Sequence, residues 1–166
     1  MRINPSIDVN ESTAIVLNSK VYEKGKTAVI LVGGGSPKNF ILQTEPQIQE
    51  ILRIQEVGQD YFIQITDARV DTGGLSGATP KEAVTWGKID PNEVEKSVIV
   101  YTDSTIALPL ITAYIMQNTD PKKLKRLYDR KDELMEKLKK SYFENFRRVA
   151  AKEMSEIEEL INNNFE

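Results

Sequence analysis

The chain has 166 residues, of which 40% are hydrophobic and 28% charged, which is the size of one globular domain with room for a core. Its 22 basic and 25 acidic residues leave a net charge of -3, so the overall charge does not indicate nucleic acid as a partner. The sequence contains no cysteine and no histidine, which excludes disulfides, zinc–thiolate sites, thiol nucleophiles and serine–histidine–aspartate triads. Acid–base chemistry must therefore use Asp, Glu, Lys or Tyr, and we expect no metal site.

Nothing in the sequence indicates a membrane or a secretory route. The longest apolar stretches, Thr27–Val32 and Ile106–Met116, are well short of the roughly 20 residues that a membrane-spanning helix needs. The segment Met1–Glu11 has no apolar region typical of a signal peptide. Together with the absence of cysteine, these features predict a cytoplasmic protein.

The first predicted elements are a helix and three strands. The amino-terminal helical pattern, which we expect Asp8 to cap, runs through Val21. Two of the three β-branched runs that follow are nearly continuous in Val and Ile, which is typical of parallel strands with both faces covered. The predicted strands are Thr27–Val32, Tyr61–Ile65 and Ser97–Tyr101.

Helical patterns lie between and after these strands. Apolar residues recur at helical spacing within Phe40–Ile54, and Ser104–Met116 is an apolar helix candidate after the third strand. Thr79 followed by Pro80 is typical of an N-cap and first helical position, and it predicts a short helix. The alternation of strands and helices predicts a Rossmann-like α/β domain, with a parallel sheet and flanking helices, over residues 1–120.

The segment Asp120–Phe165 has a near-heptad apolar spacing and predicts a long, charged carboxyl-terminal helix over residues 121–166. Lys122–Arg148 contains 11 basic and 5 acidic residues, a net charge of +6, whereas the chain from Val149 onward contains 1 basic and 5 acidic residues, a net charge of -4. A basic stripe of this kind can contact nucleic acid. We favour a packing or oligomerisation helix, because its leucine and aromatic positions need a partner surface.

Two glycine-rich segments follow predicted strands and are candidate binding loops. Gly33-Gly34-Gly35-Ser36 lets backbone approach a ligand, although a tight strand–helix turn needs the same residues. The loop Thr66–Thr79 carries Asp67 and Asp71 at the expected carboxyl edge of the sheet, where open α/β sheets bind ligands. We expect no secondary structure in this loop, and its length favours a functional role.

Two further groups carry candidate chemistry. Lys88 follows Trp86, whose ring can provide the apolar surroundings that a lysine needs to act as a neutral nucleophile. Taken alone, this pattern is more typical of a surface lysine beside a core tryptophan. Asp103, after the third strand, can cap the next helix or bind a ribose hydroxyl, and the cap is the simpler interpretation.

Together these segments resemble the carboxyl-terminal half of deoxyhypusine synthases, the NAD-dependent enzymes that move an aminobutyl group from spermidine to a protein lysine. The resemblance rests on GGGSPKNF at Gly33–Phe40, SGATPKEAVTWGKI at Ser76–Ile89 and VYTDSTIALPL at Val100–Leu110. Their order and spacing match the family over about Ala28–Ala113. The residues in these motifs are most similar to those of the bacterial deoxyhypusine synthase-like group.

The resemblance implies roles for particular residues. Lys88 would carry the butylimine covalently, Trp86 would line the polyamine channel, and Glu82 would pair with one of the polyamine's ammonium groups. The other implied polyamine contacts are Lys38, Asp71, Gly73 and Gly74. The implied NAD contacts are Gly34, Asp67, Ala68, Asp103 and Ser104.

The sequence departs from the family at two polyamine contacts and in its length. Asn39 stands where the family has a histidine, and Leu75 stands where it has an aspartate. The family chain is much longer, its amino-terminal half supplies the turn that holds the NAD phosphate, and its active sites lie between subunits. We therefore expect a homo-oligomer or a second chain that supplies the missing half.

The predicted function is NAD-dependent transfer of an aminobutyl group from a polyamine to an amine acceptor through a lysine imine. Two alternatives remain open at this point. One is homospermidine-synthase-like transfer to a small amine, and the other is a non-catalytic subunit or fragment that retains a nucleotide or polyamine pocket. Neither nucleic acid nor a membrane is an expected partner.

Overall fold

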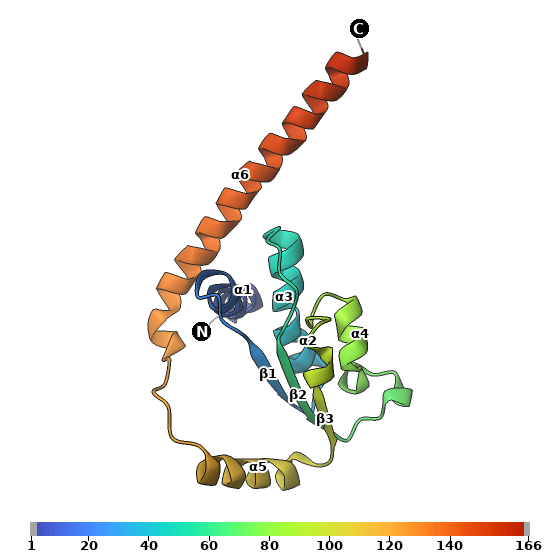
Figure 1. Cartoon of the computed structure of the whole chain (residues 1–166), viewed down its shortest axis with the longest axis vertical. Coiled ribbons are helices and arrows are strands. Elements are labelled where there is room, and N and C mark those ends of the chain that lie inside the picture. The colour runs from blue at the N-terminus through green and yellow to red at the C-terminus, as the bar shows by residue number, and fades with distance from the viewer. Residues whose placement is uncertain (1–2, 165–166) are drawn as a thin grey trace.

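The computed structural model describes residues 3–164, with side chains as far as Glu158, and contains one parallel sheet with helices around it (Figure 1). Three strands alternate with short helices, and two longer helices follow the last strand. The strands are β1 (Ala28–Val32), β2 (Tyr61–Thr66) and β3 (Val98–Tyr101). The α-helices are α1 (Pro5–Leu17), α2 (Ser36–Leu42), α3 (Thr44–Pro46), α4 (Pro80–Thr85), α5 (Ser104–Asn118) and α6 (Lys131–Asn164).

The sheet has the strand order β1-β2-β3, and both pairs are parallel. The register places Ile30 opposite Ile63, and Ile63 opposite Val98, so one apolar row crosses all three strands. The predicted α/β fold with a parallel sheet and a long carboxyl-terminal helix is therefore confirmed.

Helices α2 and α4 cover one face of the sheet. Their apolar residues pack against the side chains that alternate along the strands toward that face, as the two-residue period of a strand requires. This core contains Val29, Leu31, Leu42, Phe62, Ala83 and Ile89.

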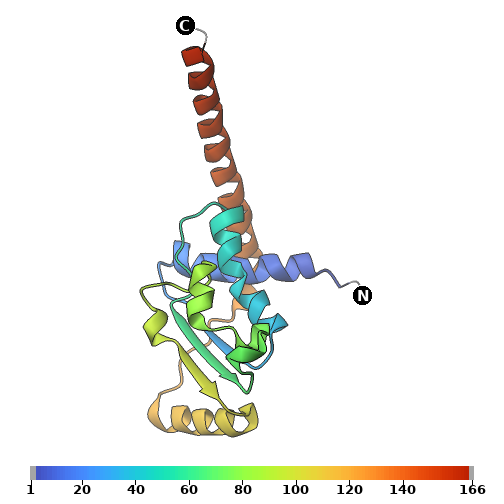
Figure 2. The same cartoon turned by 90° about the vertical axis from the view of Figure 1, so that its right-hand side faces the viewer.

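The opposite face of the sheet is largely exposed, so the prediction that both faces are covered is wrong for this chain. Ile30 is 66% exposed, and Val32, Tyr61 and Val98 are also exposed. Helix α5 lies across the carboxyl ends of the strands rather than over this face, as Figures 1 and 2 show. The Val and Ile residues of the strands thus form an apolar sheet face that no residue among 3–158 covers.

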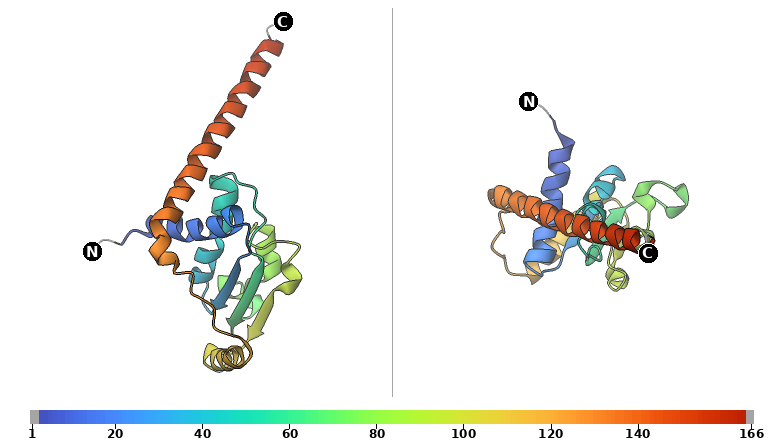
Figure 3. Two further views of the ribbon diagram at one scale, coloured as in Figure 1. Left: turned by 60° about the vertical axis from the view of Figure 1, so that its left-hand side comes forward. Right: turned by 90° about the horizontal axis from the view of Figure 1, so that it is seen from above.

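A second core joins the two ends of the chain. Helix α1 packs against the first turns of α6, where Leu134 and Leu138 are buried against Ala14, Leu17 and Ile48. Beyond this contact α6 runs away from the sheet, and the left view of Figure 3 shows its last turns standing clear of the other elements.

Two of the predicted helices differ in detail from the structure. The amino-terminal helix is capped by Asn4, whose side chain accepts a hydrogen bond from Ser6, and Asp8 lies in its first turn. The helical pattern in Phe40–Ile54 begins earlier, at Ser36, and breaks into α2, α3 and a π-helical turn over Gln47–Ile51. Pro46 explains the break, because a proline cannot donate the backbone hydrogen bond that a continuous helix needs.

The carboxyl-terminal helix begins later than predicted. An extended segment and the 3-10 turn Leu127–Arg130 precede α6, which begins at Lys131. The predicted helix end at Phe165 lies outside the described residues. The division of the chain at residue 120 remains a prediction. Within residues 3–164, no helix is both long enough and apolar enough to span a bilayer.

Candidate active site

The three strand-to-helix connections lie along the carboxyl edge of the sheet. Gly33 continues the ladder by donating to the Ile65 carbonyl (2.7 Å), and Thr102 does the same to the Thr66 carbonyl (3.2 Å). This arrangement follows from the parallel pairing, which places the ends of all three strands at one edge. The edge carries the predicted cofactor residues Gly34, Asp67, Ala68, Asp103 and Ser104.

The residues at this edge leave room for a ligand. Gly34 has φ +66°, in the left-handed region that favours glycine, and it is exposed. Asp67 is exposed as well, and Ala68 donates its N–H to Thr66 Oγ1 (3.1 Å). Asp103 caps α5 by accepting from the N–H (2.8 Å) and hydroxyl (2.6 Å) of Thr105, and these bonds lower the pKa of its carboxyl group.

Lys88 lies apart from that edge, beneath α2. Its side chain is buried, with only 7% of the residue exposed, and its Nζ donates to Asn39 Oδ1 at 2.7 Å. The same Nζ is 5.0 Å from the centroid of the Trp86 ring, within range of a cation–π interaction. Because Trp86 is 48% exposed, the interpretation of a surface lysine beside a core tryptophan is reversed: the lysine is buried and the tryptophan is at the surface.

The chain holds Lys88 in place through a tight turn and a short bridge. Gly87 has φ +67°, and a Cβ atom there would lie 2.3 Å from Gln49 Oε1, so only glycine fits. Gln49 Nε2 donates to the Gly87 carbonyl at 2.7 Å. Ile89 then forms a parallel bridge with Gln59, just before β2, which fixes the backbone on the far side of Lys88.

Burial determines the protonation of this amine. Desolvation lowers the pKa of Lys88 from its ordinary value, because removing water disfavours the charged ammonium form. A lowered pKa raises the fraction of neutral amine, which is the form that attacks a carbonyl or imine carbon. Lys88 therefore has the setting that a lysine nucleophile requires.

Lys38 lies next to Lys88 and is also buried. Its Nζ donates to Gln64 Oε1 (3.0 Å) and to the Ala78 carbonyl (2.5 Å). Desolvation lowers the Lys38 pKa, the charge of Glu82 raises it, and the charge of Lys88 lowers it further. The sequence analysis missed Gln64, although a lone polar residue inside a β-branched strand was a signal for it.

Lys38 and Lys88 both line one small cavity. It has a volume of about 10 Å³, room for about one water molecule. Leu75 and Trp86, both partly exposed, form part of its wall. The lining residues are Lys38, Asn39, Leu42, Leu75, Ala78, Ala83, Trp86 and Lys88.

The remaining predicted polyamine contacts are at the surface. Asp71 pairs with Arg69 (3.2 Å) on an exposed loop, which also carries Gly73 and Gly74. This loop contains two 3-10 turns, so the prediction of a segment without secondary structure is wrong. Glu82 is exposed, and Thr79 Oγ1 donates to its carboxylate at 3.2 Å. The described structure thus brings together Lys38, Trp86 and Lys88, and leaves Asp71, Gly73 and Gly74 apart from them.

The cap of α4 supports this arrangement. Thr79 accepts a hydrogen bond from the Glu82 N–H (3.3 Å), and Pro80 occupies the first position of the helix, as predicted. We expect Thr79→Ala to lower the free energy of unfolding by about 1 kcal/mol, because an orphan helix donor loses its acceptor. Urea unfolding measures the change, with Lys81→Ala on an exposed position of the same helix as the control. Equal stability of the two variants would contradict this role for Thr79.

Asn39 is the side chain that accepts the hydrogen bond of Lys88, so its charge can be used to test the setting of this amine. We expect Asn39→Asp to raise the pKa of Lys88 by about one unit or more, because a carboxylate at hydrogen-bond distance favours the ammonium form. The pH dependence of labelling at Lys88 by an amine-reactive reagent, followed by mass spectrometry, measures this shift. Asn118→Asp, on exposed α5, should leave the profile unchanged. An unchanged profile in Asn39→Asp would show that the 2.7 Å contact does not govern Lys88.

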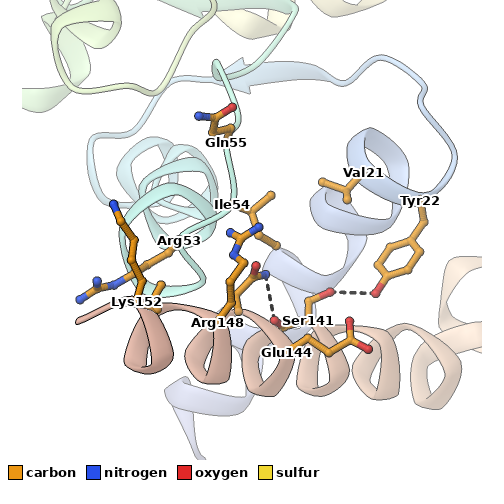
Figure 4. A pocket seen from close by; sticks show the side chains of 11 residues that line it. Val21, Tyr22, Arg53, Ile54, Gln55, Ser141, Glu144, Arg148 and Lys152 are labelled. Atoms are coloured by element: carbon orange, nitrogen blue, oxygen red, sulfur yellow. Dashed lines mark hydrogen bonds between the residues drawn. The ribbon is translucent and has the colours of Figure 1, made fainter. Parts of the chain in front are cut away.

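A larger cavity, of about 900 Å³, opens between α6 and the body (Figure 4). Arg148 and Lys152 rise from α6 toward the segment Arg53–Gln55, and Tyr22 is hydrogen-bonded to Ser141 at 2.8 Å. None of the predicted site residues lines this groove. It is therefore a separate feature from the site around Lys88.

The fold and the site define a class: an α/β protein with a parallel sheet, exposed glycine-rich loops at the carboxyl edge of the sheet and, beneath one covering helix, a buried lysine amine. The chain belongs to the deoxyhypusine synthase family, since the model of that family matches residues 1–115.

Curated relatives agree with this assignment. The chain is 60% identical over 140 residues to a deoxyhypusine synthase-like protein of Nostoc sp. (strain PCC 7120), covering 84% of this chain and 36% of the relative. It is 58% identical over 144 residues to the corresponding protein of Thermosynechococcus vestitus, covering 86% and 36%. A probable deoxyhypusine synthase 2 of Methanosarcina acetivorans is 46% identical over 119 residues, covering 72% and 32%. The chain thus spans about a third of the length of these relatives.

Proposed function

We propose that this chain carries the covalent half of a deoxyhypusine synthase-like reaction, in which an aminobutyl group passes from a polyamine to an amine acceptor through an imine on Lys88. The observation that carries the proposal is the buried amine of Lys88, which has one hydrogen-bond acceptor, an aromatic neighbour and a lowered pKa. Membership of the family supports the reaction type.

The chemistry needs a neutral amine and an oxidised donor. Dehydrogenation of the donor turns its C–N single bond into an imine, and the neutral Nζ of Lys88 attacks that carbon. A C=N bond to Lys88 forms, the donor's C–N bond breaks, and the leaving amine takes a proton. The acceptor amine later displaces Lys88 in the same way, and reduction of the final imine completes the transfer.

The family resemblance implies that NAD would accept the hydride removed from the donor and would later return it to the final imine. The carboxyl edge of the sheet fits part of such a cofactor, because Gly34 leaves open backbone and Asp67 presents an exposed carboxylate that can accept from ribose hydroxyls. Asp103 is engaged as a helix cap, and Ser104 begins that helix. The family resemblance implies a site assembled from two chains.

Substrate entry requires the cavity beside Lys88 to widen. A volume of about 10 Å³ cannot hold an aminobutyl group, so Leu75 or Trp86 must move outward when substrate binds. Gly73 and Gly74 precede Leu75, and a Cβ atom added at either would have nothing within 4 Å, so the loop has space to rotate. Leu75 thereby becomes the residue that sets how wide the channel opens.

The partner would cover the exposed sheet face. An apolar row on a central parallel sheet is stable only when another layer packs on it. Ile30, Val32 and Val98 on the sheet, and Ile106 and Leu110 on α5, are exposed apolar side chains that a second layer could cover. We propose that a deoxyhypusine synthase-like amino-terminal half docks on this face of the sheet.

The test combines this chain with the amino-terminal part of the Nostoc relative that it does not match. The pair is incubated with NAD and spermidine and then treated with borohydride, and we expect a trapped aminobutyl adduct on this chain. Adding either a protein acceptor or putrescine, without borohydride, separates transfer to a protein lysine from homospermidine-synthase-like transfer. Binding of NAD without an adduct, across several polyamines, would support the non-catalytic alternative instead.

A further inference from the structure

After its buried first turns, α6 follows the body along one side as far as Lys152 and the Arg53–Glu153 ion pair (3.4 Å), and its carboxyl-terminal turns then project from the body. Between Lys131 and Glu158, the buried side chains of α6 are Leu134, Leu138 and Ser141, all in its first turns. After them the helix continues to Asn164, and Figures 1 and 3 show it projecting away from the sheet and from α1. A projecting helix of this length is not stable on propensity alone, so packing against another surface is expected.

The part of α6 after these buried turns carries an apolar stripe. Phe143, Phe146, Met154 and Ile157 are each more than half exposed, and Ala150 lies between them. Their successive spacings of three, four, four and three residues place them on one side of the helix. Glu153 is the polar residue nearest to this stripe.

The stripe is distinct from the side that faces the body. Ser141, Asn145, Arg148 and Lys152 also follow helical spacing, and they line the groove beneath α6 (Figure 4). On a helix with 3.6 residues per turn, the midlines of these two sets are more than a quarter turn apart. Phe146 and Ala150, at one edge of the stripe, also line a smaller cavity with Ile51, Leu52 and Arg53 of the body. The four large apolar side chains of the stripe nevertheless stay more than half exposed, so a partner can contact them while α6 is docked.

The charge of α6 is polarised along its length. Lys139, Lys140, Arg147 and Arg148 lie in the first part, whereas Glu153, Glu156 and Glu158 follow the middle of the stripe. Two such helices side by side in parallel would place like charges together. An antiparallel pair places the basic part of each helix beside the acidic part of the other, which is favourable.

We propose that the stripe is the interface with a second copy of this chain, and that two α6 helices pair in antiparallel orientation about Ala150. The pairing brings Phe143 near the second copy's Ile157, and Phe146 near its Met154. Each copy would bury roughly 500 Å² of its surface, since large aromatic side chains bury 150–250 Å² when fully covered. The total of about 1,000 Å² reaches the lower size of a specific interface.

Light scattering after gel filtration tests the pairing on the full chain. We expect the wild type to be dimeric at tens of micromolar, and Phe143→Ser with Met154→Ser to raise the dissociation constant at least tenfold. The matched control changes Leu124 and Tyr128 to Ser, because these are also exposed apolar residues, more so than Phe143 and Met154, and lie before α6. Circular dichroism confirms that all variants are folded. A monomeric wild type, or a dimer unaffected by the stripe variant, would overturn the proposal.

A spin label tests the orientation. The sequence contains no cysteine, so Lys140→Cys introduces the only thiol. An antiparallel pair centred on Ala150 places the two labels about 30 Å apart, at about 1.5 Å per residue. A parallel pair brings them to about the 8–10 Å separation of packed helices. The short distance would overturn the antiparallel arrangement, and either result is independent of the reaction at Lys88.

Discussion

Replacing Lys88 by alanine is expected to abolish aminobutyl transfer by the assembled protein, with a loss of about a thousandfold or more, the order seen when a covalent nucleophile is removed. The reason is that Lys88 is the buried amine that Trp86 and Asn39 surround. Lys88→Arg should be equally inactive, because a guanidinium stays protonated and cannot form an imine. The measurement is the transfer rate together with the yield of borohydride-trapped adduct.

The control for this prediction is Lys81→Ala. Lys81 is exposed on α4, seven residues before Lys88, so its removal changes the charge of the same region without touching the cavity. Transfer at the wild-type rate is expected in this variant. A Lys88→Ala protein that still transfers, or still forms the adduct, would remove Lys88 from the reaction.

The second large effect is expected at Glu45, whose carboxyl group is fully buried on α3. Neither of its carboxyl oxygens has a hydrogen-bond partner among the described residues. Burial raises the pKa of Glu45 to about 8; the charge of Lys20 opposes this, and the charges of Glu56 and Asp60 add to it. Lys20 is already engaged by Glu56 (2.6 Å) and Asp60 (3.4 Å), so two other carboxylates occupy the ammonium group that could neutralise Glu45.

This raised pKa makes stability depend on pH in a defined direction. The folded state holds the Glu45 proton more tightly than the unfolded state, so the contribution is complete below the ordinary pKa of 4.5 and is lost as pH rises toward about 8. Glutamine stays neutral at every pH. We therefore expect the free energy of unfolding of Glu45→Gln, relative to that of the wild type, to increase between pH 5 and pH 9. The gain should be several kcal/mol, since one pKa unit corresponds to about 1.4 kcal/mol.

Urea unfolding at pH 5, 7 and 9 measures this difference. Glu50→Gln is the control, because Glu50 lies in the next turn of the chain and is exposed. The control should follow the wild type at each pH. A constant difference between Glu45→Gln and the wild type across this range would show that Glu45 is ionised in the folded protein.

The elements that the sequence predicted well are those whose signal is local. The three strands follow from β-branched runs, and the α4 cap follows from Thr79 and Pro80, because these residues act on their own backbone. The breaks inside Phe40–Ile54 were missed because the helical spacing of the apolar residues continues past Pro46, which interrupts the backbone hydrogen bonding there. The exposed sheet face was also missed. The apolar pattern of a strand predicts that its face is covered, but it does not identify the segment or the chain that covers it.

The candidate site shows the same division. The resemblance named Trp86 and Lys88, but only the structure shows that Asn39, one of the two departures from the family, accepts the hydrogen bond of Lys88. Leu75, the other departure, forms part of the cavity wall. Contacts between residues so far apart in the chain depend on how α2 and α4 pack on the sheet, which no local pattern records.

The measurement that tests the central proposal most directly is peptide mapping of the borohydride-trapped protein. The chain, assembled with the amino-terminal part of its Nostoc relative, is treated with spermidine and NAD, reduced, digested and analysed by mass spectrometry. The proposal predicts an aminobutyl group on the peptide that contains Lys88. An adduct confined to other lysines, or none while NAD and polyamine both bind, would contradict it.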